Sequence, residues 1–404
     1  MHHEMKIRDS IDMICFSHLR WGFVFQRPQH LMSRFARGRR VFFLEEPEYK
    51  DIVEANLNSA ICPRTGVFVV TPHLPESNRS NDVRPVLRNL LRQFFDREHI
   101  HRYIAWFYTP MALDFAGEIS PAVTIYDCMD ELSLFRGAPA RLCENELELF
   151  ERADLVFTGG ASLFEAKRNL HPRVYAFPSG VDVSHFLQAR SISKPFQEHN
   201  HIPRPRLGYA GVIDERMDLE LIDRLTERRP AWQIVMLGPV VKIDPTSLPH
   251  RDNLHWLGMK DYAELPHYFA GWDVGMLPFA MNESTRFISP TKTPEYLAAG
   301  LPVVSTPIRD VVKPYGELGL ARIAADAEQF VMACEQSMAY GMTMKWRRRV
   351  DSFLETLSWD DTWNSMNRLV EQALASNTRR PTVMAAGRSR DAAAQSDAVI
   401  SEAS

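Results

Sequence analysis

Short hydrophobic runs recur along the first half of the chain, and a turn and a longer mixed segment follow each run. The runs are nearly continuous and rich in Val, Ile and Phe. This pattern is typical of parallel strands that helices cover on both faces of a sheet. We therefore predict strands over residues 11–16, 41–44, 67–70, 103–108, 123–126, 155–157 and 174–177.

The polar, proline-containing segment 188–206 interrupts this pattern and is predicted to be an interdomain linker. The pattern then starts again, which predicts strands over residues 207–209, 234–237, 254–256, 274–277 and 302–304. A chain of 404 residues suits two domains of ordinary size. We expect α/β domains over residues 1–187 and 207–357.

The last part of the chain contains a segment with a helical pattern and then a segment with no pattern. Ser358 is an expected helix cap, with Asp361 in capping-box position, and apolar residues follow at helical spacing. This predicts a helix over residues 358–375. Residues 376–404 are rich in Ser, Ala, Arg and Asp with few large apolar side chains, so we predict a disordered tail.

Residues 84–97 combine apolar side chains at helical spacing with four arginines. A basic amphipathic helix of this kind can lie on an anionic membrane surface. It can equally pack its apolar face on the first sheet. The pattern leaves both alternatives open.

Composition narrows the class of protein. A formal net charge of -4 argues against nucleic acid as the main partner. The five cysteines include no Cys-x-x-Cys pair, which indicates reduced thiols and no recognisable zinc site. No apolar run approaches the ~18 residues of a membrane span, and the first residues form no secretory signal. We expect a cytoplasmic protein, or one on the inner face of a membrane.

The most informative stretch for chemistry is 289–304, SPTKTPEYLAAGLPVV. Pro294 is tolerated only in the first turn of a helix, and Gly300 suits the end of one. The N-terminus of this short helix, with Lys292 beside it, suits a diphosphate. Glu295 can accept hydrogen bonds from ribose hydroxyls. The alternative is a surface helix whose charged side chains are merely solvated.

A second candidate site follows the first predicted strand of the second domain. Gly211 allows a ligand to approach the backbone closely, and Arg216 can bind a phosphate. The alternative is an ordinary turn with Arg216 in solvent. The chain contains neither a Gly-x-Gly-x-x-Gly fingerprint nor a P-loop, so nicotinamide and P-loop functions lose support.

The first domain offers two candidate groups of its own. The loop after its first strand contains His18, Arg20, Trp21 and Arg27, which suit a general base and the binding of a sugar or anionic acceptor. Asp127, Asp130 and Glu131 follow a buried strand, where ligands usually bind. A hydrogen-bonded structural His18 and helix capping by Asp130 are the alternatives.

Four motifs together resemble the retaining nucleotide-sugar glycosyltransferases of the GT-B fold, and especially the bacterial branch that builds exopolysaccharide and teichuronic-acid-like polymers. The first motif is WGFVFQRPQHL at 21–31. The second is ADLVFT at 153–158, followed by PSGVD at 178–182. The third is NLHWLG at 253–258 with WDVGMLP at 272–278, and the fourth is the 289–304 stretch.

The resemblance implies two Rossmann-like domains facing across a cleft, with a C-terminal helix crossing back to the first. It implies that a nucleotide-sugar donor binds the second domain and a saccharide or lipid-linked acceptor the first. Glu295 would hold the ribose, Arg216 and Lys292 the diphosphate, and Gly258 and Lys260 the base. It implies neither a metal nor another cofactor, and the pathway would be cell-surface polysaccharide biosynthesis.

Two positions depart from the family pattern. Phe287 occupies the place of a second Glu that usually touches the donor sugar, so those contacts are expected from Asn282, Glu283 or Ser284. Asp127 and Asp130 stand where relatives often have a catalytic His. A nucleotide-sugar epimerase and a catalytically silent scaffold of the same fold are the alternatives.

Overall fold

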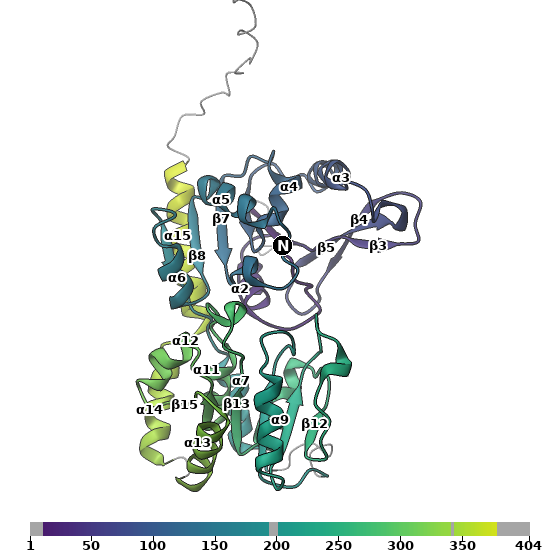
Figure 1. Cartoon of the computed structure of the whole chain (residues 1–404). Coiled ribbons are helices and arrows are strands. Elements are labelled where there is room, and N and C mark those ends of the chain that lie inside the picture. Colours follow the sequence, from purple (N-terminus) through teal and green to yellow (C-terminus); the bar gives the residue numbers. More distant parts are fainter. Residues whose placement is uncertain (1–10, 194–200, 341–342, 378–404) are drawn as a thin grey trace, which may run out of the picture.

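The computed structural model describes residues 11–193, 201–340 and 343–377, which form two α/β units stacked end to end (Figure 1). Part of the expected linker and most of the expected C-terminal tail lie outside these ranges. Residues 376 and 377, assigned to that tail, instead extend the last helix. Within the described part of the chain, no helix is long and apolar enough to span a bilayer.

The first unit is built on a nine-stranded sheet with the order β3-β5-β2-β1-β6-β7-β8-β9, and β4 pairs with β5. All pairings are parallel except that of β4 with β5. All seven predicted strands are present, whereas β3 and β4 were missed. The strands are β1 (Asp12–Phe16), β2 (Val41–Leu44), β3 (Glu48–Lys50), β4 (Asn56–Ile61), β5 (Phe68–Pro75), β6 (Tyr103–Phe107), β7 (Val123–Cys128), β8 (Leu155–Thr158) and β9 (Val174–Ala176).

The second unit has a parallel six-stranded sheet with the order β12-β11-β10-β13-β14-β15. The five strands predicted here are present, and the edge strand β15 was missed. The strands are β10 (Arg206–Ala210), β11 (Gln233–Leu237), β12 (Leu254–Trp256), β13 (Val274–Leu277), β14 (Val303–Ser305) and β15 (Ala321–Ile323).

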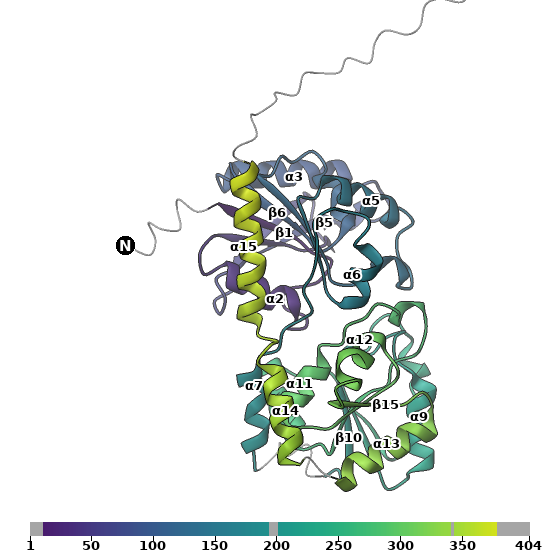
Figure 2. The same ribbon diagram turned by 90° about the vertical axis from the view of Figure 1, so that its left-hand side faces the viewer.

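Helices cover both faces of each sheet, as the continuous apolar strands predict (Figure 2). In the first unit they are α2 (Arg27–Phe35), α3 (Arg84–Arg97), α4 (Leu113–Ala116), α5 (Leu142–Arg152) and α6 (Ala161–Lys167). In the second they are α7 (Val183–Leu187), α9 (Leu219–Arg228), α10 (Leu265–Ala270), α11 (Lys292–Ala299), α12 (Arg309–Val311), α13 (Ala327–Tyr340) and α14 (Met344–Leu354).

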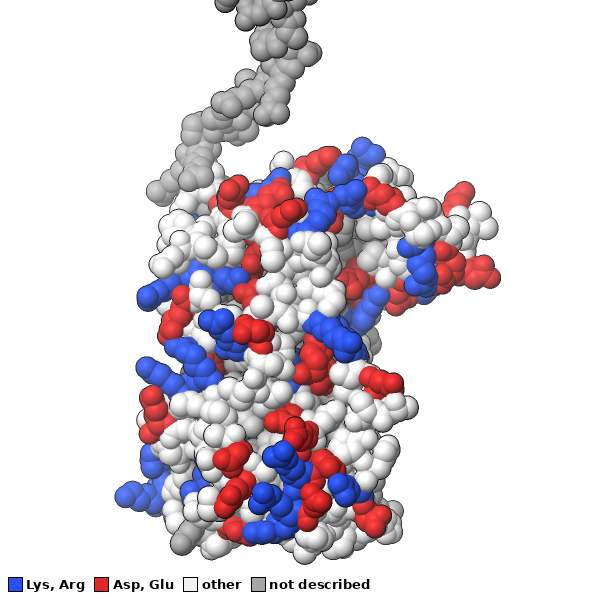
Figure 3. Space-filling model, in the orientation of Figure 1, with Lys and Arg blue, Asp and Glu red and all other residues white. Residues whose placement is uncertain are grey.

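The basic helix α3 packs on the sheet. Its apolar side chains, among them Leu91 and Phe94, are buried in the core of the first unit. Arg84 pairs with Asp82, and Arg97 pairs with Glu98. The apolar face is therefore unavailable to a membrane, which favours the core-packing alternative. On the face seen in Figure 3, basic and acidic side chains are interspersed.

The last helix, α15 (Trp359–Asn377), leaves the second unit and lies along the first, as predicted (Figure 2). Ser358 Oγ accepts hydrogen bonds from the backbone N–H groups of Asp360 and Asp361. The buried side chains of Met366 and Val370 join the core on the face of the first sheet opposite α3. The C-terminal helix is thus part of the N-terminal hydrophobic core.

We predict that Met366→Ala destabilises the protein by about 2–4 kcal/mol, because Met366 is fully buried in the core that α15 shares with the first sheet. Urea unfolding monitored by circular dichroism measures the change. Gln372→Ala, at an exposed position of the same helix, is the control. Equal stabilities of the two variants would show that α15 is not integral to the core.

Candidate active site

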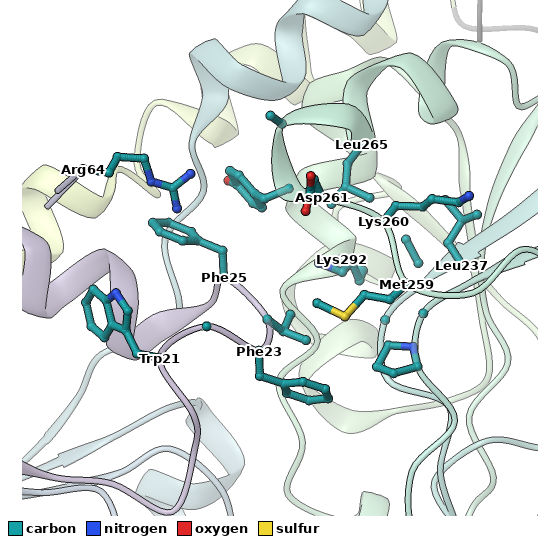
Figure 4. Close-up of a pocket in the computed structure, with 18 residues that line it drawn as sticks. Trp21, Phe23, Phe25, Arg64, Leu237, Met259, Lys260, Asp261, Leu265 and Lys292 are labelled. Carbon is teal, nitrogen blue, oxygen red and sulfur yellow. The ribbon is translucent and has the colours of Figure 1, made fainter. Parts of the chain in front are cut away.

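A cavity of about 330 Å³ lies between the two units, at the carboxyl ends of their strands (Figure 4). One wall comes from the loop after β1 and the turn between β4 and β5, and the other from the second unit. Ligands bind α/β sheets at such edges. The first wall consists of Trp21, Gly22, Phe23, Val24, Phe25 and Arg64, and the second includes Gly211, Gly238, Met259, Lys260, Tyr262 and Lys292.

Three glycines hold the ends of β10, β11 and β12 together on the second wall. Gly211 N–H donates to the Leu237 carbonyl at 2.9 Å, and Gly238 N–H donates to the Gly258 carbonyl at 2.8 Å. Gly238 has φ +141°, and a Cβ there would lie 1.8 Å from the Gly211 carbonyl oxygen. Only glycine fits at Gly238, so the cavity is lined by closely approaching backbone. Gly211 and Gly258 were expected in the donor site, whereas Gly238 was missed.

Helix α11 brings Lys292 and Glu295 to the cavity's edge. It begins at Lys292 and ends before Gly300, whose φ is +86°, as the Pro294 and Gly300 spacing predicts. The Tyr296 hydroxyl accepts a 2.7 Å hydrogen bond from Ala210 N–H, which fixes the helix against the end of β10. The helix is buried, so the solvated-surface alternative does not apply.

The charges of Lys292 and Glu295 are paired with each other. Lys292 Nζ lies 2.7 Å from Glu295 Oε2, and their side chains are only 15% and 10% exposed. Lys292 also lines the cavity. Lys260, the other lysine expected in the donor site, lines the same cavity, with its Nζ 5.4 Å from the centre of the Tyr268 ring.

Arg216 is held at the interface of the two units. Its guanidinium donates to both carboxylate oxygens of Asp214, at 2.6–3.1 Å, and lies 5.3 Å from the centre of the Phe135 ring of the first unit. Lys242 Nζ lies 5.5 Å from the same ring. Burial opposes the charge of Arg216, but the hydrogen bonds to Asp214 and the charges of Asp214 and Asp130 together outweigh it and raise the arginine's pKa. Arg216 is therefore a fixed cation, not a solvated one.

Asp130 and His18 face this region from the first unit. Burial raises the pKa of Asp130 to about 6, opposed by the charge of Arg216. Burial lowers the pKa of His18 to about 4, and Lys242 adds to the effect. His18 Nδ1 is buried and has no hydrogen-bond partner in the described part of the chain. Neither residue is among those that line the cavity, so the catalytic role expected for each stays a prediction.

Asp127 and Arg27, by contrast, form a buried pair. Arg27 Nη2 lies 2.8 Å from Asp127 Oδ1, and its Nη1 donates to the Phe177 carbonyl at 2.6 Å. Asp127 is 0% exposed and Arg27 only 1%. Neither side chain has surface to offer a substrate. The structure therefore argues against the catalytic role expected for Asp127 and the acceptor contact expected for Arg27, and we assign the pair a structural role.

Arg20 and Trp21 have different positions although they are neighbours. Arg20 Nη1 lies 3.1 Å from Glu45 and also donates to the Glu46 carbonyl at 2.6 Å, so its charge is already neutralised. The Trp21 side chain lines the cavity, and its backbone N–H donates to Glu45 Oε1 at 2.7 Å. The Trp21 ring packs on Phe43, with ring centres 4.9 Å apart, so its contact with a substrate stays a prediction, and Arg20 fixes the loop.

Arg64 and Tyr262 also line the cavity, and sequence reasoning missed both. The Arg64 guanidinium lies 5.0 Å from the centre of the Phe25 ring (Figure 4). The centre of the Phe25 ring lies 5.0 Å from that of the Tyr262 ring. Arg64 is in the turn between β4 and β5, a hairpin for which the sequence gives no alternating pattern. No cluster of three or more metal-ligating side chains occurs among the described residues.

Comparison with known proteins identifies the second unit. Residues 204–339 match the family "Glycosyl transferases group 1". These residues form a group 1 glycosyltransferase domain. Lys260, Lys292, Glu295 and the three glycines at the strand ends all lie within it. The family resemblance expected from the four motifs is confirmed.

A curated relative supports the same family. The chain is 25% identical over 258 residues to a protein of Bacillus subtilis (strain 168) whose name assigns it to teichuronic acid biosynthesis as the glycosyltransferase TuaH. The alignment covers 58% of this chain and 64% of that protein, so the chain matches just under two thirds of the relative's length.

Solved structures confirm the GT-B fold of the whole chain. Sucrose-phosphate synthase from Thermosynechococcus elongatus superposes with a TM-score of 0.66 and 13% identity, covering 91% of this chain and 100% of that one. Anabaena HepE, solved in complex with UDP and glucose, gives a TM-score of 0.64 and 12% identity, covering 90% and 100%. The glycosyltransferase domain and the N-terminal unit are thus the two halves of one fold.

Phe287 occupies the position where the family pattern has a Glu. Its side chain extends from the glycosyltransferase domain and packs against the apolar core of the first unit. Nearby, Asn282 caps a short helical turn, Glu283–Thr285, and its Nδ2 donates to the Glu215 carbonyl at 3.2 Å. The departure from the family pattern therefore contributes to the contact between the two units.

The pKa of Asp130 predicts how stability depends on pH. The Asp130 carboxyl has a pKa of about 6 in the folded protein and 3.8 in the unfolded chain, so the folded protein binds more protons between these values. Its contribution to the free energy of unfolding therefore falls as pH rises from about 4 to 6. Over this range we expect the free energy of unfolding of the wild type to fall by up to about 3 kcal/mol relative to that of Asp130→Asn. Urea unfolding of both proteins at each pH measures it; a constant difference would contradict the pKa shift.

Proposed function

We propose that this protein transfers a hexose-type sugar from a nucleotide-diphosphate donor to a saccharide or lipid-linked acceptor. The observation that carries the proposal is the placement of Lys292 at the start of α11, where it lines the cavity between the two units and pairs with Glu295 of the group 1 glycosyltransferase domain. The position in the GT-B fold and the relationship to TuaH support the same activity and its place in cell-surface polysaccharide biosynthesis.

The donor would bind mainly to the second unit. The glycine-lined ends of β10 and β11 leave room for a nucleotide to approach the backbone. Glu295 would accept hydrogen bonds from the ribose, and the segment from Gly258 to Lys260 would frame the base. Lys292 would turn from Glu295 towards the diphosphate. Because its partner is already a carboxylate, exchanging it for a phosphate keeps the buried lysine charged and paired.

Catalysis would depend on stabilising the leaving group. Breaking the bond at the anomeric carbon puts negative charge on the diphosphate. Lys292, the N-terminus of α11 and Arg216 supply fixed positive charge for it. In this proposal the transfer needs no metal ion and retains the configuration at the anomeric carbon. On the acceptor side, burial lowers the pKa of His18 to about 4, so at pH 7 the neutral imidazole would accept a hydrogen bond from the acceptor hydroxyl and act only as a weak base.

Nucleotide binding tests the donor site directly. We predict that one of UDP, GDP, CDP and ADP raises the melting temperature of the wild type. A ligand at 100 times its dissociation constant stabilises the folded protein by about 2.7 kcal/mol. Glu295→Ala should lose this shift relative to its own ligand-free melting temperature. Absence of a shift with all four nucleotides would instead favour a catalytically silent scaffold.

Turnover tests the role of Lys292. We predict that Lys292→Ala lowers kcat about a hundredfold, because losing one charged contact to the developing diphosphate costs roughly 3 kcal/mol. Release of the nucleotide diphosphate from a matching donor measures the rate. Lys345→Ala, at an exposed position on α14, is the control and should match wild type. A change of only a few-fold for Lys292→Ala would contradict the assignment, and interconversion of the donor without acceptor would indicate an epimerase.

A further inference from the structure

A second cavity, of about 340 Å³, lies wholly within the first unit. Phe16 ends β1 and Leu44 ends β2, and both side chains line it. Leu87 of α3 and Phe115 of α4 close it from the outside. The cavity therefore lies between the sheet and its helices, at the carboxyl edge where α/β sheets bind ligands.

Glu45 links the second cavity to the loop that lines the first. This carboxylate is 7% exposed and lines the second cavity. Its Oε1 accepts the Trp21 backbone N–H at 2.7 Å, and its Oε2 accepts Arg20 Nη1 at 3.1 Å and Thr71 Oγ1 at 2.9 Å. Trp21 lines the first cavity. The loop that faces the donor site is thus bonded directly to the rim of the second cavity.

The chemistry of the lining selects an uncharged, apolar ligand. Three of the four charged residues of the lining already have partners: Glu45 is bonded as described, Asp114 accepts from Asn145 Nδ2 at 3.0 Å, and Arg84 pairs with Asp82. The fourth is Glu46, and burial raises the pKa of its carboxyl, which favours the neutral form. Arg84 is the one cation among the described lining residues. An anionic ligand would meet carboxylates without a free cation, whereas an apolar group would bury the exposed surface of aliphatic and aromatic side chains.

We propose that this cavity receives an alkyl chain of the glycosyl acceptor, whose sugar lies on the side of the Trp21 loop, towards the donor cavity. The inference rests on the proposed function and adds the class of acceptor to it: an amphiphile, not a free sugar. The depth of the cavity limits how much of the chain is buried, and the remainder lies outside the protein.

Calorimetric titration with n-alkyl β-D-glucosides, from methyl to octyl and below their micelle concentrations, tests the proposal. The dissociation constant should fall about fourfold for each added methylene until the cavity is filled, and then level off. Val83→Trp places a large side chain in the cavity from the half-buried start of α3 and should abolish this dependence. Val86→Trp, on the same helix but not lining the cavity, is the matched control and should keep it.

Three outcomes would overturn the proposal. The wild type could show no dependence on chain length, Val83→Trp could keep the full dependence, or Val86→Trp could lose it as completely as Val83→Trp. Nucleotide binding, measured on the same three proteins, separates this proposal from the proposed function. If the protein binds a nucleotide but its affinity for the glucosides does not depend on chain length, only the proposed alkyl site is wrong. Absence of nucleotide binding removes the transferase and, with it, the assignment of this cavity to an acceptor.

Discussion

The position of the two sheets relative to each other depends on the place where the two segments that connect them are joined by a hydrogen bond. Val181 N–H, on the way out of the first unit, donates to the Leu357 carbonyl, on the way back, at 2.8 Å. Gly180 makes this contact possible, because a Cβ there would lie 2.8 Å from the backbone nitrogen of Trp359. Next to it, Trp359 stacks on His30 with ring centres 4.6 Å apart. The carboxyl ends of both sheets face each other because the chain crosses twice at one place.

The charges that this arrangement brings to the cleft are already paired. Lys292 is held by Glu295 and Arg216 by Asp214, and each pair lies within one unit. Such pairs keep buried cations charged and oriented before any substrate arrives, so little reorganisation is needed when a negative charge develops beside them. Arg216 is also in contact with the first unit, through the Phe135 ring and the charge of Asp130.

The sequence allowed prediction of features that depend on local pattern. Buried strands are continuous apolar runs, and Pro294 and Gly300 set the two ends of α11 by their own backbone preferences. The hairpin strand β4 was missed because most of its residues are exposed and it has no apolar run. The pairing of Arg27 with Asp127 joins residues a hundred positions apart, so no local pattern distinguishes this structural carboxylate from a catalytic one.

The contacts between the two units are of two kinds. Beside the cavity, aromatic rings of both units pack together: Phe25 contacts Tyr262, and His185 stacks on Tyr262 at 4.4 Å. Between α6 and α12 the contacts are polar: Asp310 of the second unit accepts from Ser162 N–H, and Arg309 pairs with the exposed Glu165. The Asp310–Ser162 contact is buried, so separating the units there would leave a carboxylate without its partner, whereas separating the aromatic contacts would expose hydrophobic surface. Both buried contacts therefore hold the units together, and the exposed ion pair adds little.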